Sequence, residues 1–204
     1  IINPEGAVIY RGEGVTVSAA NPYARAVAQG TKLILVYHPT GTSTVLAISH
    51  QTDTGVIVAT APTNVLTINS ANSLFDVTAY DASSWYVVGR DGPGTAVTIA
   101  EIDTVTPTGV TQGIAMTGEA KVSLWGDTTN SRVWLGYLDD PSGSPVVGYA
   151  ALPVPLSTPT YAKTTINAVL STAGPPLFGP RYSRAGLNAD VFFVYNTTAA
   201  SGVY

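Results

Sequence analysis

Cysteine is absent from this chain, and charged side chains are scarce. The 204 residues contain no cysteine, and Asp, Glu, Lys and Arg together make up 11%. Without thiols the protein forms no disulfide and offers no thiolate to a metal ion. Soluble domains usually carry about 25% charged residues, so Ser, Thr, Asn, Gln and backbone groups must supply most of the polar surface here.

Clustered basic residues and long apolar runs are missing too. The formal net charge is −4 and no run of Lys or Arg occurs, whereas nucleic-acid binding depends on cations that neutralise phosphates. We therefore expect no direct nucleic-acid contact from this segment. No apolar run approaches the roughly 18 residues of a membrane-spanning helix, so we expect no membrane span. The sequence starts at Ile1 rather than Met, which suggests a fragment or processed product of a longer chain.

What the sequence does contain is a β-hairpin pattern that occurs four times. Each copy is a short apolar run, a turn rich in Gly, Pro, Asp or Asn, and a second run. The paired runs are 33–37 with 44–48, 85–89 with 96–100, 133–137 with 146–150, and 191–195 with 202–204. Further candidate strands are 23–28, 75–80, 121–125 and 182–187 before the hairpins, and 55–59 and 110–116 after them. Helical periodicity is nearly absent, so the sequence predicts an all-β fold.

These strands group into repeating units within a single domain, residues 1–204. The units begin near residues 22, 73, 120 and 181 and are about 50 residues long. Four strands at this period predict an antiparallel meander of the β-propeller type. Two further strands, 7–10 and 15–19, would complete the fourth unit and close a ring.

Two stretches of the second unit carry a resemblance to a known family. They read Phe-Asp-Val-Thr-Ala-Tyr-Asp at 75–81 and Val-Val-Gly-Arg-Asp-Gly at 87–92. This pattern resembles the blades of tandem-repeat β-propeller proteins of the phage-tail and lectin type. The resemblance covers two of the four units well and implies that each unit is one blade.

One segment departs from the strand pattern. Residues 157–159 (Ser-Thr-Pro) combine a capping hydroxyl with proline at a first helical position, and 174–176 (Gly-Pro-Pro) form a stop signal. Apolar residues recur at helical spacing between them, which predicts a helix over 160–172. An inserted helix is awkward in a propeller but ordinary in a viral jelly-roll capsid domain. A β-sandwich or jelly roll is therefore the alternative architecture.

The residues that usually carry catalysis or bind metals do not converge in this sequence. Zinc needs three or four convergent ligands, and the two histidines, His38 and His50, have only Asp53 nearby. The acids that could pair, 101 with 103 and 139 with 140, lie on a strand and in a turn, where structural roles suffice. We therefore expect no enzyme, no metal and no cofactor.

Aromatic residues on the repeated units are the candidate ligand-binding group. An aromatic face beside Asn, Asp or Arg is the usual surface for stacking a sugar. The candidate ligand-binding residues are Trp85, Arg90, Asp91, Trp125, Asn130, Trp134 and Tyr137. Trp85 and Val87 share one face of a strand, and Tyr86 and Val88 share the other. One face must be core, so we expect at most half of these rings to be available.

The sequence favours a protein that acts by assembly or attachment rather than by chemistry. The first hypothesis is a non-enzymatic structural or attachment protein of a virus or phage particle: a capsid, spike or tail component. Its expected location is the virion or the extracellular space. Its expected partners are copies of itself, other particle proteins, or a host-surface glycan. The alternative is a secreted carbohydrate-binding lectin.

Overall fold

The computed structural model describes the body of the chain in ten segments. These are residues 24–39, 42–51, 61–68, 75–90, 96–115, 121–139, 146–157, 164–166, 177–181 and 190–194. Every regular element in these segments is a β-strand, which confirms the all-β prediction. Among the same residues, no helix is long and apolar enough to cross a bilayer.

The strands form three four-stranded antiparallel sheets and one two-stranded sheet. The first contains β1 (Ala24–Gln29), β2 (Lys32–Tyr37), β3 (Thr44–Gln51) and β4 (Thr63–Thr67). The second contains β5 (Phe75–Ala79), β6 (Trp85–Arg90), β7 (Ala96–Asp103) and β8 (Thr106–Ala115). The third contains β9 (Lys121–Asp127), β10 (Arg132–Asp139), β11 (Val146–Pro153) and β12 (Thr164–Ile166). The fourth pairs β13 (Leu177–Arg181) with β14 (Asp190–Val194).

Three of the four predicted hairpins are confirmed by the strand pairing. They are β2 with β3, β6 with β7, and β10 with β11. In the fourth unit, β14 pairs with the preceding β13, and the predicted strands 182–187 and 202–204 lie outside the described residues. Residues 7–10, 15–19 and 55–59 also lie outside them.

The predicted helix over 160–172 is wrong where the structure describes it. Residues 164–166 form β12, which adds to the edge of β11 with Ile166 opposite Val147 and Thr164 opposite Tyr149. Thr-Thr-Ile is β-branched throughout, and the edge of β11 offers unpaired backbone groups, so sheet pairing prevails over the local helix signals. The rest of 160–172 lies outside the described residues.

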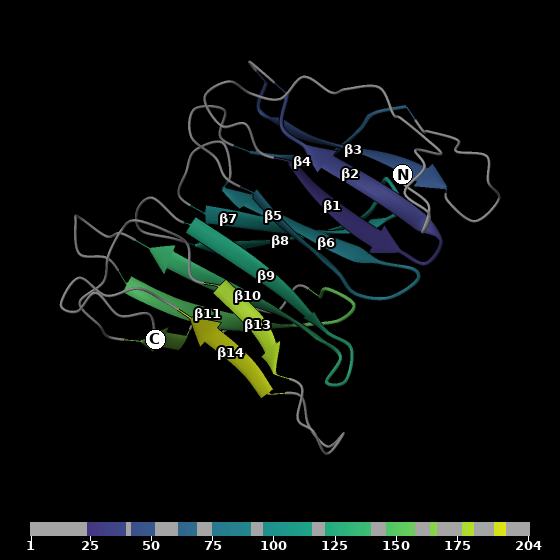
Figure 1. The fold of residues 1–204 in the computed structure, drawn as a ribbon. Coiled ribbons are helices and arrows are strands. Elements are labelled where there is room, and N and C mark those ends of the chain that lie inside the picture. Colours follow the sequence, from purple (N-terminus) through teal and green to yellow (C-terminus); the bar gives the residue numbers. More distant parts are fainter. Residues whose placement is uncertain are drawn as a thin grey trace, which may run out of the picture.

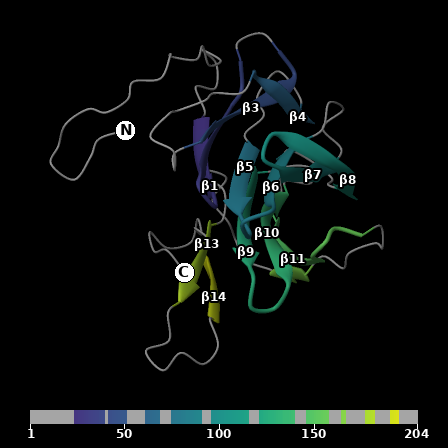
Figure 2. The ribbon, with the colours of Figure 1, turned by 90° about the vertical axis from the view of Figure 1, so that its right-hand side faces the viewer.

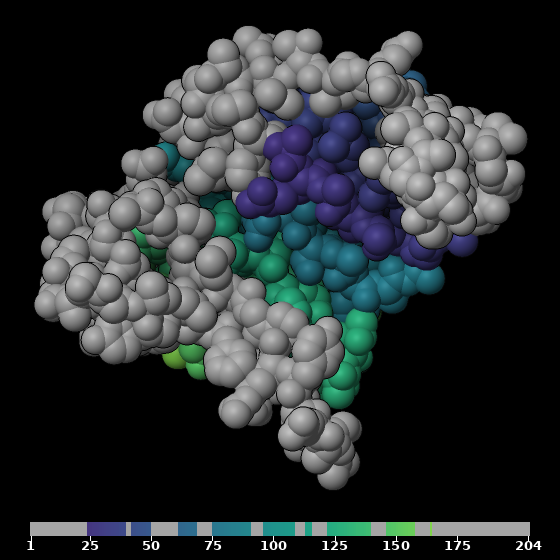
Figure 3. Space-filling view, viewed as in Figure 1, coloured from purple at the N-terminus to yellow at the C-terminus, as the bar shows by residue number. Residues whose placement is uncertain are grey.

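The sheets follow one another in chain order, as blades do in a propeller (Figures 1 and 2). Strand order within each four-stranded sheet also follows the chain, unlike the crossed order of a jelly roll. The first strands lie side by side: β1 contacts β5, β5 contacts β9, and β9 contacts β13. In the space-filling view, the purple, teal and green surfaces of the first three sheets succeed one another (Figure 3).

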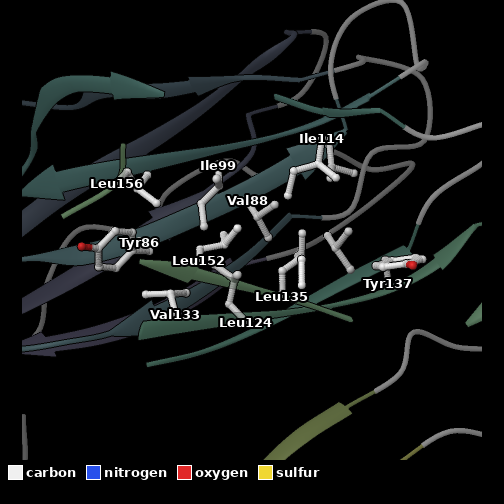
Figure 4. Close-up of a cluster of buried hydrophobic side chains, with 13 residues drawn as sticks. Tyr86, Val88, Ile99, Ile114, Leu124, Val133, Leu135, Tyr137, Leu152 and Leu156 are labelled. Carbon is white, nitrogen blue, oxygen red and sulfur yellow. The ribbon is translucent and has the colours of Figure 1, made fainter. Parts of the chain in front are cut away.

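Two hydrophobic cores lie between consecutive sheets. The first and second sheets enclose Val27, Ile34, Val36, Val45, Ala47, Val65, Leu66, Ile68, Phe75, Trp85, Val87, Ala100 and Ile102. The second and third sheets enclose Tyr86, Val88, Val97, Ile99, Ile114, Val122, Leu124, Val133, Leu135, Tyr137, Ala150, Leu152 and Leu156. Figure 4 shows this second core extending from Tyr86 at one end to Tyr137 at the other.

Both faces of β6 are therefore buried, which the sequence did not predict. Trp85 and Val87 lie in the first core, while Tyr86 and Val88 lie in the second. All four side chains have 0% exposure. The sequence set an upper limit of half of these rings being available, and on this strand neither ring is, because the second sheet has a neighbour on each side.

Buried polar contacts fix how the first and second sheets meet. Thr104, in the turn between β7 and β8, has a φ of 56°, which is strained for a β-branched residue. Its amide donates to Oε1 of Gln29 at 3.1 Å, and Nζ of Lys32 donates to its hydroxyl at 2.6 Å. Nε1 of Trp85 donates to its carbonyl oxygen at 2.8 Å. These contacts hold the turn in its strained conformation.

A second set of polar contacts links the first strands of three sheets. Asp76 on β5 accepts a hydrogen bond from the amide of Leu124 on β9 at 2.8 Å. Its other carboxylate oxygen lies 3.5 Å from Nε of Arg25 on β1. The amide of Gly126 donates to the hydroxyl of Thr78 at 3.0 Å. Glycine is needed at 126, because a Cβ there would collide with the carbonyl oxygen of Ala79.

Asp76→Ala should lower the free energy of unfolding by about 1–3 kcal/mol, because the amide of Leu124 loses its acceptor. Asp76→Asn keeps an acceptor at that position and should stay close to wild type. Thr106→Ala, at an exposed position of β8, is the control and should change stability by less than about 0.5 kcal/mol. Urea unfolding followed by circular dichroism measures all three variants.

The contribution of the Asp76 carboxyl to folding stability should change with pH in a defined direction. Burial raises the pKa of Asp76 above its ordinary 3.8, although the amides of Leu124 and Val77 and the charge of Arg25 oppose the rise. A raised pKa means that the folded chain binds the proton more tightly than the unfolded chain. Wild type should therefore gain stability relative to Asp76→Asn as the pH falls from neutral towards 3.8. A relative loss over that range would contradict this assignment.

Candidate functional site

Two of the predicted ligand-binding residues lie in the core. Trp85 is fully buried between the first and second sheets, and its indole N–H donates to the carbonyl oxygen of Thr104. Tyr137 is 1% exposed, and its hydroxyl donates to the carbonyl oxygen of Thr164 at 3.3 Å. Neither ring is accessible to a ligand, so these two predictions are corrected. Arg90 ends β6 and is half-buried, and Asp91 lies outside the described residues.

The other three predicted residues come together on the third sheet. Trp125 on β9 pairs with Trp134 on β10, so both rings lie on the face turned away from the second sheet. Asn130 lies in the turn that joins these strands. Tyr149 on β11 lies on the same face, with its ring centroid 5.9 Å from that of Trp134 and the planes at 56°. We call Trp125, Asp127, Asn130, Trp134 and Tyr149 the aromatic face.

Asp127 holds this group in place. Its carboxylate accepts hydrogen bonds from the amide of Asn130 at 3.1 Å and from the side-chain Nδ2 of Asn130 at 2.7 Å. Nε1 of Trp134 donates to the same carboxylate at 3.2 Å. Local aspartate bonds of this kind are typical of turns. Here the bonds also orient an aromatic ring seven residues further along the chain.

The carboxylate of Asp127 stays ionised at neutral pH. Burial alone would raise its pKa, but the hydrogen bonds from Asn130, Trp134 and the amide of Thr129 outweigh that effect and lower the pKa below 3.8. An ionised carboxylate has about four acceptor positions. The side-chain amide of Asn130, which is exposed, lies beside it. Asp127 itself is 2% exposed, and its acceptor positions are taken by these bonds. The aromatic face thus combines half-buried rings and an exposed amide with a buried carboxylate that holds them.

The corresponding pairs in the other sheets are used for packing. Val27 opposite Ile34 faces the second sheet, and both are buried. Thr78 opposite Tyr86 faces the third sheet, where Tyr86 is fully buried. The third sheet has a pair of tryptophans at this place, and both are half-buried rather than buried. The aromatic face therefore retains accessible ring surface where the other sheets have core.

Sequence reasoning missed two members of the aromatic face. Asp127 was visible only as a turn residue, and its bond to Trp134 depends on the turn geometry. Tyr149 could have been found from strand alternation. Tyr149 lies opposite Gly136 in the pairing of β10 with β11. Gly136 is two residues after Trp134 on the same strand, so Tyr149 and Trp134 lie on the same face of the sheet.

The acids and histidine considered for catalysis have structural partners where they are described. Glu101 accepts a hydrogen bond from the amide of Leu156 at 3.4 Å. Burial, and then the charge of Glu101, raise the pKa of Tyr86. His38 is 1% exposed, and its Nε2 lies 2.7 Å from the carbonyl oxygen of Thr42. In the described part of the chain, no three His, Asp or Glu side chains gather in a way that could hold a metal ion.

Comparison with known proteins gives a structural likeness but no sequence family. No family model matches the chain, and no curated protein sequence matches it. Among solved structures, the chain is similar to a mutant of the Aleuria aurantia lectin AAL in complex with Fucα1-6GlcNAc, with a TM-score of 0.52 and 12% sequence identity. The match covers 93% of this chain and 59% of the lectin chain. The likeness supports the propeller-like fold.

The indole N–H resonance of Trp134 should report the charge of Asp127. A lowered pKa means that the stabilising carboxylate is present above pH 3.8 and is lost as the pH falls through the lower folded-state value. In ¹H–¹⁵N spectra the Trp134 indole signal should stay constant from pH 7 and shift only below 3.8. Asp81→Ala is the control, because Asp81 bonds the amides of Ser83 and Ser84 in a similar turn. That variant should leave the Trp134 signal in place, whereas a shift near pH 5 would contradict the assignment.

Proposed function

We propose that this protein is a non-enzymatic carbohydrate-binding protein and that the aromatic face of the third sheet takes the sugar. The observation that carries the proposal is the half-buried Trp125–Trp134 pair with Asp127, Asn130 and Tyr149 around it. Likeness to a lectin solved with a bound disaccharide supports the same reading.

The chemistry of the aromatic face suits a neutral sugar ring. One face of a pyranose presents polarised C–H groups, and the negative π face of an indole attracts them while apolar surface leaves water. Hydroxyl groups at the edge of the sugar need fixed polar partners. The exposed side-chain amide of Asn130 can both donate and accept, and the buried carboxylate of Asp127 holds it in place.

Preorganisation adds to the affinity expected of this surface. Trp134 is held by its hydrogen bond to Asp127 and by the ring of Tyr149. A ring fixed before binding loses little conformational entropy when the sugar stacks on it. The low charge of the chain, 11% of residues, also suits a partner whose own groups are neutral hydroxyls.

The virion or phage-particle role, the first hypothesis from the sequence, has no support in the fold or in the comparisons, and it stays a prediction. The glycan partner is the part of that hypothesis that agrees with the aromatic face. Extracellular action is proposed with the lectin function, since that is where free and cell-surface glycans meet a binding protein.

Trp134→Ala should weaken glycan binding at least tenfold, about 1.4 kcal/mol, because the stacking surface is removed. Trp134→Phe keeps an aromatic face and should bind more tightly than the alanine variant. A glycan array finds the ligand, and titration calorimetry measures the affinity, with Fucα1-6GlcNAc as one defined probe. No binding to any array glycan, or equal binding by wild type and Trp134→Ala, would overturn the proposal.

Trp85→Ala is the comparison variant that shows what loss of folding stability alone does to glycan binding. This ring is buried core, so its loss should lower the free energy of unfolding by about 3–5 kcal/mol. Trp134→Ala, at a half-buried ring, should cost less stability. Thermal unfolding measured beside calorimetry shows whether each loss of binding comes from the site or from the fold.

A further inference from the structure

Asn130 is exposed, yet Asp127 holds it at two points. The backbone amide of Asn130 donates to Oδ1 of Asp127 at 3.1 Å, and its side-chain Nδ2 donates to Oδ2 of the same carboxylate at 2.7 Å. Two bonds from one residue to one carboxylate fix the direction of the side chain as well as its position. Asp127 is itself 2% exposed, so it is held by the sheet around it. The amide that this turn offers to solvent is therefore a rigid group.

The backbone of the same turn is anchored too. Ser131, the next residue, has a φ of 52°, which is uncommon for a residue with a side chain. Its carbonyl oxygen accepts a hydrogen bond from the amide of Val154, directly after β11, at 3.1 Å. The turn between β9 and β10 is thus bonded to the chain that leaves β11, and Asn130 stands on a fixed backbone.

The charge of Asp127 decides which way the side-chain amide of Asn130 faces. An ionised carboxylate only accepts hydrogen bonds, and only the nitrogen end of an amide donates them. The pKa of Asp127 is lowered, so the carboxylate is ionised at neutral pH. Nδ2 must therefore face Asp127, and Oδ1 must face away from it. Among the described residues none donates to this Oδ1, and the side chain is exposed.

Trp134 shares the anchor of Asn130. Its Nε1 donates to Oδ2 of Asp127 at 3.2 Å, the same oxygen that binds Nδ2 of Asn130. The two nitrogens therefore lie within about 6 Å of each other, since both are at hydrogen-bond distance from one atom. The indole N–H is already used in this bond. A sugar stacked on the ring of Trp134 thus meets the amide of Asn130 at the indole edge.

We propose that Asn130 determines the specificity of the aromatic face by requiring a sugar hydroxyl that donates a hydrogen bond to its Oδ1. This inference rests on the proposed carbohydrate-binding function and names the feature of the sugar that the site reads. A sugar that is deoxygenated, fluorinated or methylated at that hydroxyl has no hydrogen to donate. It displaces water from Oδ1 without replacing the bond, and the unsatisfied acceptor costs affinity.

Asp127 is a positioning residue in this recognition, because it is buried and acts on the sugar through Asn130. An asparagine at 127 would carry N–H groups of its own. The amide of Asn130 could then turn over, accept from residue 127 and present its N–H to the sugar. Asp127→Asn should therefore relax the requirement for a donating hydroxyl while the tryptophan rings remain.

The test uses the methyl glycosides of fucose, galactose, glucose and mannose, with deoxy, fluoro and O-methyl analogues at each ring hydroxyl in turn. Titration calorimetry measures the affinity of the full chain for each compound. For the glycoside that binds best, we expect one position at which all three analogues bind about tenfold more weakly, as the loss of one hydrogen bond predicts. Fluorine cannot donate, so the fluoro analogue separates a donating hydroxyl from an accepting one.

The variants assign that loss to Asn130. Asn130→Ala should bind the parent glycoside as weakly as wild type binds the deoxy analogue, with no further loss for the deoxy analogue itself. Asp127→Asn should reduce the loss for the fluoro analogue to less than about threefold. Thr128→Ala, at an exposed position of the same turn, is the control and should keep the wild-type pattern. Circular dichroism checks folding, and Asn130→Gln, which moves the amide by one methylene, replaces Asn130→Ala if that variant is unfolded.

The outcomes separate this inference from the function on which it rests. If wild type binds none of these glycosides, or binds them equally after Trp134→Ala, carbohydrate binding at the aromatic face fails and this inference fails with it. If binding depends on Trp134 but fluoro analogues bind as tightly as their parents at every position, only the role of Asn130 is overturned. The same holds if the Asn130 variants keep the wild-type discrimination, or if Asp127→Asn keeps the full loss for the fluoro analogue.

Discussion

The constraint on which this structure depends is that a sheet between two others has no solvent face. In β6, alternate side chains go to opposite cores: Trp85 and Val87 to one, Tyr86 and Val88 to the other. The usual alternation of apolar and polar residues is then impossible, and all four of these side chains are aromatic or aliphatic. The polar groups that remain must find partners across the sheets, as Trp85 does at Thr104 and Asp76 does at Leu124.

The third sheet satisfies this constraint differently, and the candidate site results from that difference. Its face towards the second sheet is core, with Leu135 and Leu152 fully buried. Its other face has two half-buried tryptophans where the preceding sheets have apolar packing residues or a buried tyrosine. Trp134 tolerates this position because Asp127 satisfies its indole N–H. A ring that is apolar in its body and satisfied at its edge suits partial burial, and partial burial is what a stacking surface requires.

The sequence supplied the hairpins but not their surroundings. Period-two patterns and Gly, Pro and Asp turns are local, so three hairpins and the strands 75–79 and 121–125 were predictable. Burial of Trp85 and Tyr137 was not, because it depends on which sheets lie on either side. The helix signals around 160–172 were equally local, and they failed because the edge of β11 was available to residues 164–166. Trp125, Asn130 and Trp134 were found through residue type, whereas Asp127 required the turn geometry.

Serial packing also determines how the molecule comes apart. Each sheet gains most of its support from its immediate neighbours, as repeat units do in solenoid proteins. Unfolding in such an arrangement begins at a terminal unit and moves inward. The second sheet packs against a core on each face, so its amide hydrogens should be the last to exchange. The same modularity makes the number of units easy to change by duplication or loss, since adding one sheet requires a single compatible neighbour and leaves the others undisturbed.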